Sequence, residues 1–178
     1  MGSDPGFSIR RLSSPTEEEI AQLADLLIDC VEGGASVSFM SPLTHERAFA
    51  FWRRVASDVV AGNRALLVAE DAQGILGTVQ VVLDLPENQP HRADVSKMLV
   101  HRRARRRGVG AALMQAAEET AREHGRTTLV LDTASDDARR LYERLGWRKV
   151  GDIPAYALMP DGTPCATTYY FRELSPAG

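Results

Sequence analysis

The stretch that decides the fold is Lys97-Met-Leu-Val-His-Arg-Arg-Ala-Arg-Arg-Arg-Gly-Val-Gly-Ala-Ala-Leu-Met114. Residues 98–100 form a short apolar run, five arginines follow, and after Gly108 and Gly110 apolar residues return at helical spacing. The first turn of a helix presents unpaired backbone N–H groups and the positive end of the helix dipole. Glycines leave space for a phosphate to reach these groups. We therefore predict a strand, a turn and a helix that together bind a diphosphate.

The spacing of the glycines distinguishes this turn from two other phosphate-binding motifs. A P-loop would continue with Gly-Lys-Ser/Thr, and the dinucleotide fingerprint would have glycine where Leu113 stands. The pattern Arg105-x-x-Gly108-x-Gly110 after a strand instead resembles the acyl-CoA signature of the GNAT superfamily of N-acetyltransferases. Two other interpretations of the arginines are a solvent-exposed face and a patch that binds nucleic acid.

The composition is typical of a globular protein, with 178 residues that are 44% hydrophobic and 25% charged. The net charge of -3 argues against nucleic acid as the main partner, because proteins that bind a phosphate backbone are normally basic. Cys30 and Cys165 form neither a disulfide framework nor a metal motif. There is no apolar run long enough to span a bilayer and no visible signal peptide. We expect a cytoplasmic enzyme with no metal, nucleic-acid partner or membrane partner, and leave a homodimer open.

The order of predicted elements defines the fold class. We interpret residues 1–6 as a disordered lead or a cloning remnant, and residues 7–178 as a single GNAT acetyltransferase domain. A capping box at residues 14–17 begins the first helix. Strands are predicted at 7–12, 65–70, 75–85, 93–100, 127–132, 147–153 and 167–172, and helices at 15–32, 45–61, 109–124 and 136–145. The strand–helix–strand unit at 93–132 requires a parallel pair, whereas hairpins are antiparallel. The predicted class is α/β (α+β): a GNAT-like mixed, mostly antiparallel sheet with a central parallel pair and helices on both faces.

The resemblance to the superfamily implies two sets of contacts with acetyl-CoA. In the family, a splayed strand pairs with the pantetheine arm through its free backbone, as an added strand would. The motif Ser135-x-x-Ala138-x-x-Leu141-Tyr142 resembles the helix along which CoA lies. The expected cofactor contacts are Met98, Leu99, Val100, Arg105, Arg106, Arg107, Gly108, Val109, Gly110, Ala111, Ser135, Ala138 and Tyr142.

Acetyl transfer to an amine sets three chemical requirements. The ammonium must lose a proton before it attacks, and the thiolate that leaves gains from a proton donor. A free N–H at Leu99 or Val100 could stabilise the oxyanion. The resemblance implies Tyr142 as the proton donor, and its alternative is a tyrosine that packs against CoA.

Asp94 and Asp132 are the candidates for the base, or one of them binds the ammonium while the other accepts its proton. Asp132 follows Leu129-Val130-Leu131, where burial of an unpaired carboxylate would be costly. Two structural alternatives remain open. Asp132 could cap the following loop, and Asp94 could be an exposed edge residue or a partner of Arg92.

A finer resemblance extends along most of the chain. Residues 32–40, 91–95, 131–133, 160–162 and 170–171 resemble the tabtoxin-resistance acetyltransferases, which acetylate the amine of an amino-acid-like β-lactam toxin. It implies that Asp94 and Asp132 are the family's paired acids, with Asp94 in place of an expected Glu. The expected acceptor pocket consists of Gly34, Phe39, Met40, Thr133 and Tyr156. Protein or peptide N-acetylation and a non-catalytic acyl-CoA-binding module are the alternative functions.

Overall fold

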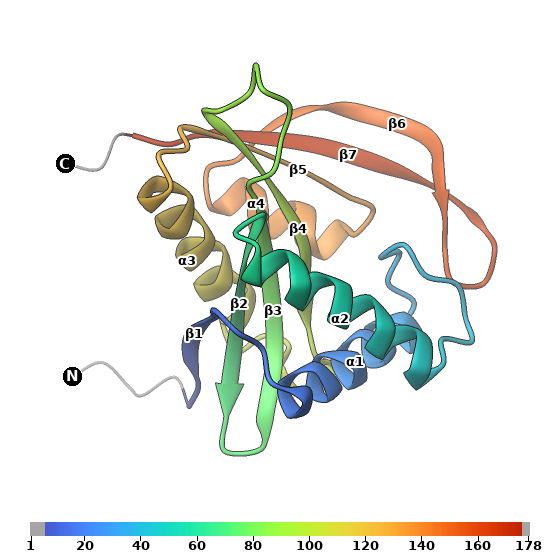
Figure 1. The fold of residues 1–178 in the computed structure, drawn as a ribbon. Coiled ribbons are helices and arrows are strands. Elements are labelled where there is room, and N and C mark those ends of the chain that lie inside the picture. Colours follow the sequence, from blue (N-terminus) through green and yellow to red (C-terminus); the bar gives the residue numbers. More distant parts are fainter. Residues whose placement is uncertain (1–5, 176–178) are drawn as a thin grey trace.

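The structure, a computed structural model, describes residues 6–175 and contains one seven-stranded sheet within that range, in the order β1-β2-β3-β4-β5-β7-β6 (Figure 1). The strands are β1 (Ser8–Leu12), β2 (Arg64–Asp71), β3 (Gly74–Val82), β4 (Arg92–Val100), β5 (Thr128–Thr133), β6 (Arg148–Leu158) and β7 (Pro164–Glu173). The helices are α1 (Glu17–Glu32), α2 (His45–Val60), α3 (Val109–Glu123) and α4 (Asp136–Arg144), with a short 3-10 helix η1 (Arg102–Ala104). Apart from Gly6, the lead expected at residues 1–6 lies outside the described residues.

The pairing of β4 with β5 is the one parallel ladder among the described strands, and it is short. Arg92–Asp94 pair with residues 128–130, whereas every other neighbouring pair is antiparallel. Beyond Asp94 the two strands diverge, so residues 95–100 have no strand partner on the side toward β5. The predicted mixed sheet with a central parallel pair is therefore confirmed.

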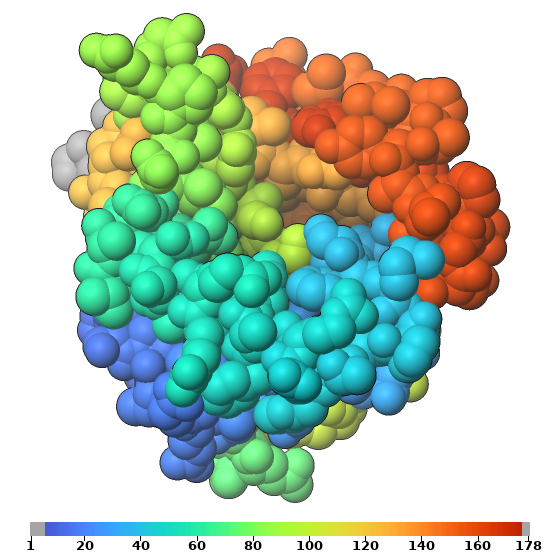
Figure 2. Space-filling model, turned by 45° about the vertical axis from the view of Figure 1, so that its right-hand side comes forward, coloured from blue at the N-terminus to red at the C-terminus, as the bar shows by residue number. Residues whose placement is uncertain are grey.

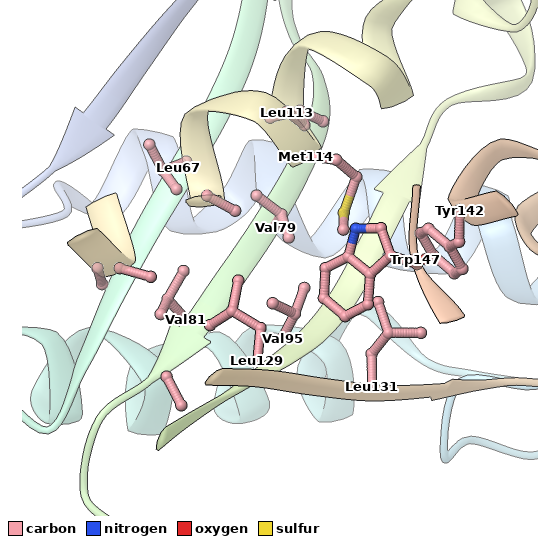
Figure 3. Close-up of a cluster of buried hydrophobic side chains, with 14 of the residues drawn as sticks. Leu67, Val79, Val81, Val95, Leu113, Met114, Leu129, Leu131, Tyr142 and Trp147 are labelled. Carbon is pink, nitrogen blue, oxygen red and sulfur yellow. The ribbon is translucent and has the colours of Figure 1, made fainter. Parts of the chain in front are cut away.

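Helices cover both faces of the sheet, as predicted (Figure 1). Helices α1 and α2 bury one set of side chains, including Leu27 and Trp52, against β2, β3 and β4. On the other face α3 packs on β2, β3 and β4, and α4 adds Tyr142 to the same cluster as Met114 of α3. Figure 3 shows Trp147 between Met114 and Tyr142 in this second core. The sheet is thus a wall between two separate cores.

Local capping signals place the helix starts, with one correction. Thr44 and Ser135 accept hydrogen bonds from the first turns of α2 and α4, as expected. The capping box of α1 is made by Thr16 and Glu19, not by residues 14–17, because Thr16 and Glu19 satisfy the reciprocal pattern and Pro15 precedes the cap.

The last strands differ most from the expectation. β6 and β7 are both longer than predicted, and β7 includes Cys165. β5 alternates buried and accessible residues. Within residues 6–175, every helix is too short or too polar to cross a membrane.

Gly77 sets how closely α3 approaches the sheet. A Cβ at Gly77 would lie 2.9 Å from Val109 Cγ1 and 3.0 Å from Leu113 Cδ1. Since Val109 is the first residue of α3, Gly77 also positions the turn before this helix.

We expect Gly77→Ala to reduce the free energy of unfolding by about 1–3 kcal/mol, because the added methyl overpacks the contact between β3 and α3. Urea unfolding measures this loss. Gly151→Ala is the control, because a Cβ there would meet no atom within 4 Å. Equal stability of the two variants would contradict the close contact at Gly77.

Candidate active site

The turn before α3 has the geometry of an anion site. Residues 105–108 are exposed, and Arg106 and Gly108 have positive φ values of 62° and 81°. Such left-handed steps direct successive N–H groups to one side. Because Gly108 is the N-cap of α3, no side chain caps the first turn of this helix, and a Cβ at Gly108 would meet no atom within 4 Å. The first-turn N–H groups of α3 are therefore open to an anion.

Gly110 lies at the contact between α3 and α4. A Cβ there would lie 3.0 Å from Leu141 Cδ2 and 3.8 Å from Met98 Cε. The absence of a side chain thus lets α4 approach α3, whereas we expected it to leave room for phosphate. Val109 has a buried side chain, so only its backbone can face a ligand.

Ion pairs hold three of the five arginines. Arg102 donates to Asp29 from its backbone N–H and from Nε, at 2.9 and 2.8 Å. Burial acts to raise the pKa of Asp29, but these hydrogen bonds outweigh it and lower that pKa below its usual value. Arg103 and Arg107 both pair with Asp71. The run is therefore not a free basic face, because it anchors the turn to α1 and to the β2–β3 hairpin.

Arg105 and Arg106 are the two arginines of the run that make no ion pair within residues 6–175. Both side chains are exposed beside the N-terminus of α3. They add positive charge at the same end of the helix as its dipole. The structure therefore brings these two arginines and the first-turn N–H groups together, as predicted.

The two candidate carboxylates lie on the sheet face opposite α3 and α4. Leu131 belongs to the α3–α4 core, and side chains alternate along a strand, so Asp132 points to the opposite face. Although Asp132 follows the apolar run Leu129-Val130-Leu131, its side chain is exposed, and β4 has already diverged from β5 at this point. Its Oδ2 accepts a hydrogen bond from Thr167 Oγ1 at 2.7 Å. Asp94 forms an ion pair with Arg92, one of the alternatives that the sequence left open.

Tyr142 approaches the divergence from the other face. Its ring lies in the core on α4, with ring centroids 6.0 Å from those of Trp147 and Tyr170. Burial raises the pKa of the Tyr142 phenol well above its ordinary value, and the charge of Asp132 adds to the rise. The phenol therefore stays protonated at neutral pH, and part of the rise in its pKa comes from the negative charge of Asp132 on the other face of the sheet.

Sequence reasoning missed Tyr169, which lies directly opposite Asp132 in the β5–β7 ladder. Its hydroxyl is hydrogen-bonded to that of Tyr156 at 3.0 Å. This bond, burial and the charges of Asp132 and Asp94 raise the pKa of Tyr169 to about 12. No local signal could have found Tyr169, because only the strand register brings it to the carboxylate.

Lys97 was also missed, and the sequence holds one signal for it. The chain contains only two lysines, Lys97 and Lys149, among many arginines. Lys97 lies in a bulge of β4 with φ 51°, and its Nζ donates to Ser38 Oγ at 3.0 Å. Burial lowers the pKa of the Lys97 ammonium, against the attraction of Asp132, which raises it.

The loop of residues 33–43 and the β6–β7 hairpin are hydrogen-bonded to each other. Ser36 Oγ donates to the Leu158 carbonyl at 3.1 Å, and the Ser41 N–H donates to the Pro160 carbonyl at 3.0 Å. Figure 2 shows the surface hollowed between this loop, in light blue, and the orange-red hairpin.

The residues expected in the acceptor pocket divide into three groups. Phe39 and Met40 lie on the loop and Tyr156 on the hairpin, the two segments that flank the hollow. The Phe39 ring packs edge-on against Phe51 of α2, with ring centroids 5.2 Å apart. Gly34 follows α1 at the start of the loop. Thr133 shares the face of Leu131 and accepts a hydrogen bond from the Ser135 N–H at 3.1 Å, so it lies away from Asp132.

The second predicted cofactor motif lies at the start of α4. Ser135 Oγ accepts a hydrogen bond from the Ala138 N–H at 3.2 Å, so its hydroxyl serves the helix cap. Within residues 6–175, no three His, Cys, Asp or Glu side chains gather into a metal-binding group.

Residues 21–147 match the model of the acetyltransferase (GNAT) family. The chain belongs to this family. This N-acetyltransferase is 27% identical over 135 residues to an uncharacterized N-acetyltransferase from the hisH-hisA intergenic region of Azospirillum brasilense, which spans 75% of this chain and 79% of that relative.

Two solved structures share the fold of this acetyltransferase at low sequence identity. The ribosomal-protein-alanine N-acetyltransferase of Brucella melitensis is 21% identical with a TM-score of 0.78, over 94% of this chain and 99% of that one. The phosphinothricin acetyltransferase of Sinorhizobium meliloti, solved in complex with AcCoA, is 16% identical with a TM-score of 0.77, over 96% of this chain and 89% of that one. The fold is thus shared by enzymes named for a protein acceptor and for a small one.

We expect Tyr142→Phe to lower kcat by about 100-fold, because it removes a buried proton donor but keeps the ring in its packing. The pKa of Tyr142 is raised above the usual tyrosine value of about 10. We therefore expect that ionisation of this phenol will not lower the wild-type rate between about pH 7 and pH 9. Steady-state kinetics at several pH values measure both effects.

The matched control is Tyr170→Phe, since Tyr170 is equally buried in the same cluster and donates to Glu143. We expect this control to retain its turnover. A kcat in Tyr142→Phe equal to that of the control would exclude Tyr142 as the proton donor.

Proposed function

We propose that this enzyme transfers an acetyl group from acetyl-CoA to the primary amine of a small molecule. The observation that carries the proposal is the divergence of β4 and β5. The turn before α3 and the protonated Tyr142 belong to one face of the sheet, and the exposed Asp132 belongs to the other. A donor and an acceptor could thus meet in the gap from opposite sides.

The residues around the turn fit acetyl-CoA. The N–H groups of the first turn of α3, with Arg105 and Arg106, would hold its diphosphate. The unpaired side of β4 at residues 98–100 would bind the pantetheine arm by strand addition. When bound, acetyl-CoA supplies the activated acetyl thioester. The Sinorhizobium enzyme with AcCoA supports this assignment by likeness of fold.

Asp132 is the better candidate for the base. The Asp94 carboxylate forms an ion pair with Arg92, whereas the Asp132 carboxylate has a hydroxyl partner and no ion pair among the described residues. An unpaired carboxylate is free to hold an ammonium and accept its proton. Tyr142 would then donate a proton to the leaving sulfur, and a backbone N–H at Leu99 or Val100 would face the oxyanion.

A small acceptor is favoured over a peptide because the loop of residues 33–43 is tied to the β6–β7 hairpin and narrows the hollow. The resemblance to tabtoxin-resistance enzymes extends the proposal to an amino-acid-like β-lactam toxin. A single domain over residues 7–178, a cytoplasmic location and resistance to a toxin belong to the same proposal.

We expect acetyl-CoA to raise the melting temperature, and a thiol-release assay over a panel of amines to detect turnover. Asp132→Asn should reduce kcat/KM by about 100-fold or more, because an amide cannot accept the proton. The affinity for acetyl-CoA, measured by calorimetry, should stay unchanged.

Asp137→Asn is the control, since Asp137 is an exposed carboxylate paired with Arg140 on α4. Wild-type activity in Asp132→Asn would refute the assignment of the base. Binding of acetyl-CoA without turnover on any amine or peptide would favour a non-catalytic acyl-CoA-binding module.

A further inference from the structure

The acceptor face of the sheet holds a cation and an anion that do not form an ion pair with each other. The Lys97 ammonium donates to the Ser38 hydroxyl, and the Asp132 carboxylate accepts from the Thr167 hydroxyl. Within residues 6–175 neither charge has an ion-pair partner, although the two attract each other electrostatically. Two opposite charges, each hydrogen-bonded to a neutral hydroxyl, therefore lie close enough to attract each other, and Ser38 ties one of them to the loop of residues 33–43.

The other cations of the neighbouring strands are already neutralised. Arg64 pairs with Asp58 at 2.8 Å, and Arg92 pairs with Asp94. Lys97 is thus the one cation of β2, β3 and β4 in this region that has no carboxylate partner among the described residues. Its positive charge remains available to a ligand.

The backbone holds Lys97 in this position at a cost. The bulge places it at a φ of 51°, which L-residues rarely adopt, and the side chain is half-buried, with Nζ 6.0 Å from the centroid of the Phe51 ring. Partial burial of a charge without a counter-ion is unfavourable. A ligand that carries a negative group would relieve this cost, whereas a purely cationic amine would not.

We infer that Lys97 is a specificity-determining residue that binds the carboxylate of the acceptor while Asp132 binds its ammonium group. The acceptor is then a zwitterion, an amino acid or an amino-acid-like molecule, and this inference rests on the proposed transfer to a small amine. Two fixed charges of opposite sign match a zwitterion, whereas a decarboxylated or amidated analogue leaves the Lys97 ammonium without a negative partner.

The test compares amino acids with their C-terminal amides as acceptors in the thiol-release assay. Wild-type enzyme should acetylate the acids with a KM about 10- to 100-fold lower than that of the amides, the range expected for one charge-assisted hydrogen bond. Lys97→Met should raise the KM of the acids to that of the amides and leave the amides unchanged. Lys97→Arg should restore part of the preference, because it keeps the charge.

Two controls separate the charge of Lys97 from other effects. Lys149→Met removes the chain's other lysine, which pairs with Asp152 on β6, and should preserve the acid-to-amide ratio. Ser38→Ala removes the hydrogen bond between Lys97 and the loop but keeps the charge, so it should also preserve that ratio.

Equal KM values for acids and amides in wild type, or an equal loss of both in Lys97→Met, would overturn the inference and leave the acetyltransferase proposal intact. A wild type that binds acetyl-CoA but acetylates no amine would overturn the proposed function, and this inference with it.

Discussion

The short parallel ladder between β4 and β5 is the constraint on which the site depends. It joins Arg92–Asp94 to residues 128–130 and then ends, although both strands continue. β5 keeps its pairing with β7, and β4 keeps its pairing with β3, so neither strand loses support when they separate. The gap between β4 and β5 is therefore stable, because each of the two strands keeps its hydrogen bonds to an antiparallel neighbour on its other side.

This gap connects two environments that the rest of the sheet keeps apart. On one face, Tyr142 is packed among aromatic rings, and burial keeps its phenol protonated. On the other, Asp132 is exposed and hydrogen-bonded to a hydroxyl. The charge of Asp132 also contributes to the raised pKa of Tyr142. An exposed carboxylate and a protonated phenol thus lie on opposite faces of the sheet.

The arginine turn shows how charge is divided between stability and binding. Three arginines pair with Asp29 and Asp71, which attach the turn to α1 and to the β2–β3 hairpin. The two that make no ion pair within residues 6–175 lie next to the start of α3. Gly77 and Gly110 then let α3 approach the sheet and α4 closely. The turn before α3 is thus held both by its own ion pairs and by the close packing of α3 against its neighbours.

Sequence alone determined the features that depend on neighbours along the chain. The helix caps at Thr44 and Ser135, the glycine turn before α3 and the mixed sheet follow from local signals, since capping, φ preference and apolar periodicity act over a few residues. The pair of Asp94 with Arg92 was one of two alternatives that the sequence offered, since these residues are neighbours on one strand. Only the tertiary structure decided that Asp132 is exposed, that Tyr169 lies opposite it and that Lys97 lies in a bulge of β4. Exposure and strand register depend on segments far apart in sequence, and no local pattern encodes where two strands cease to pair.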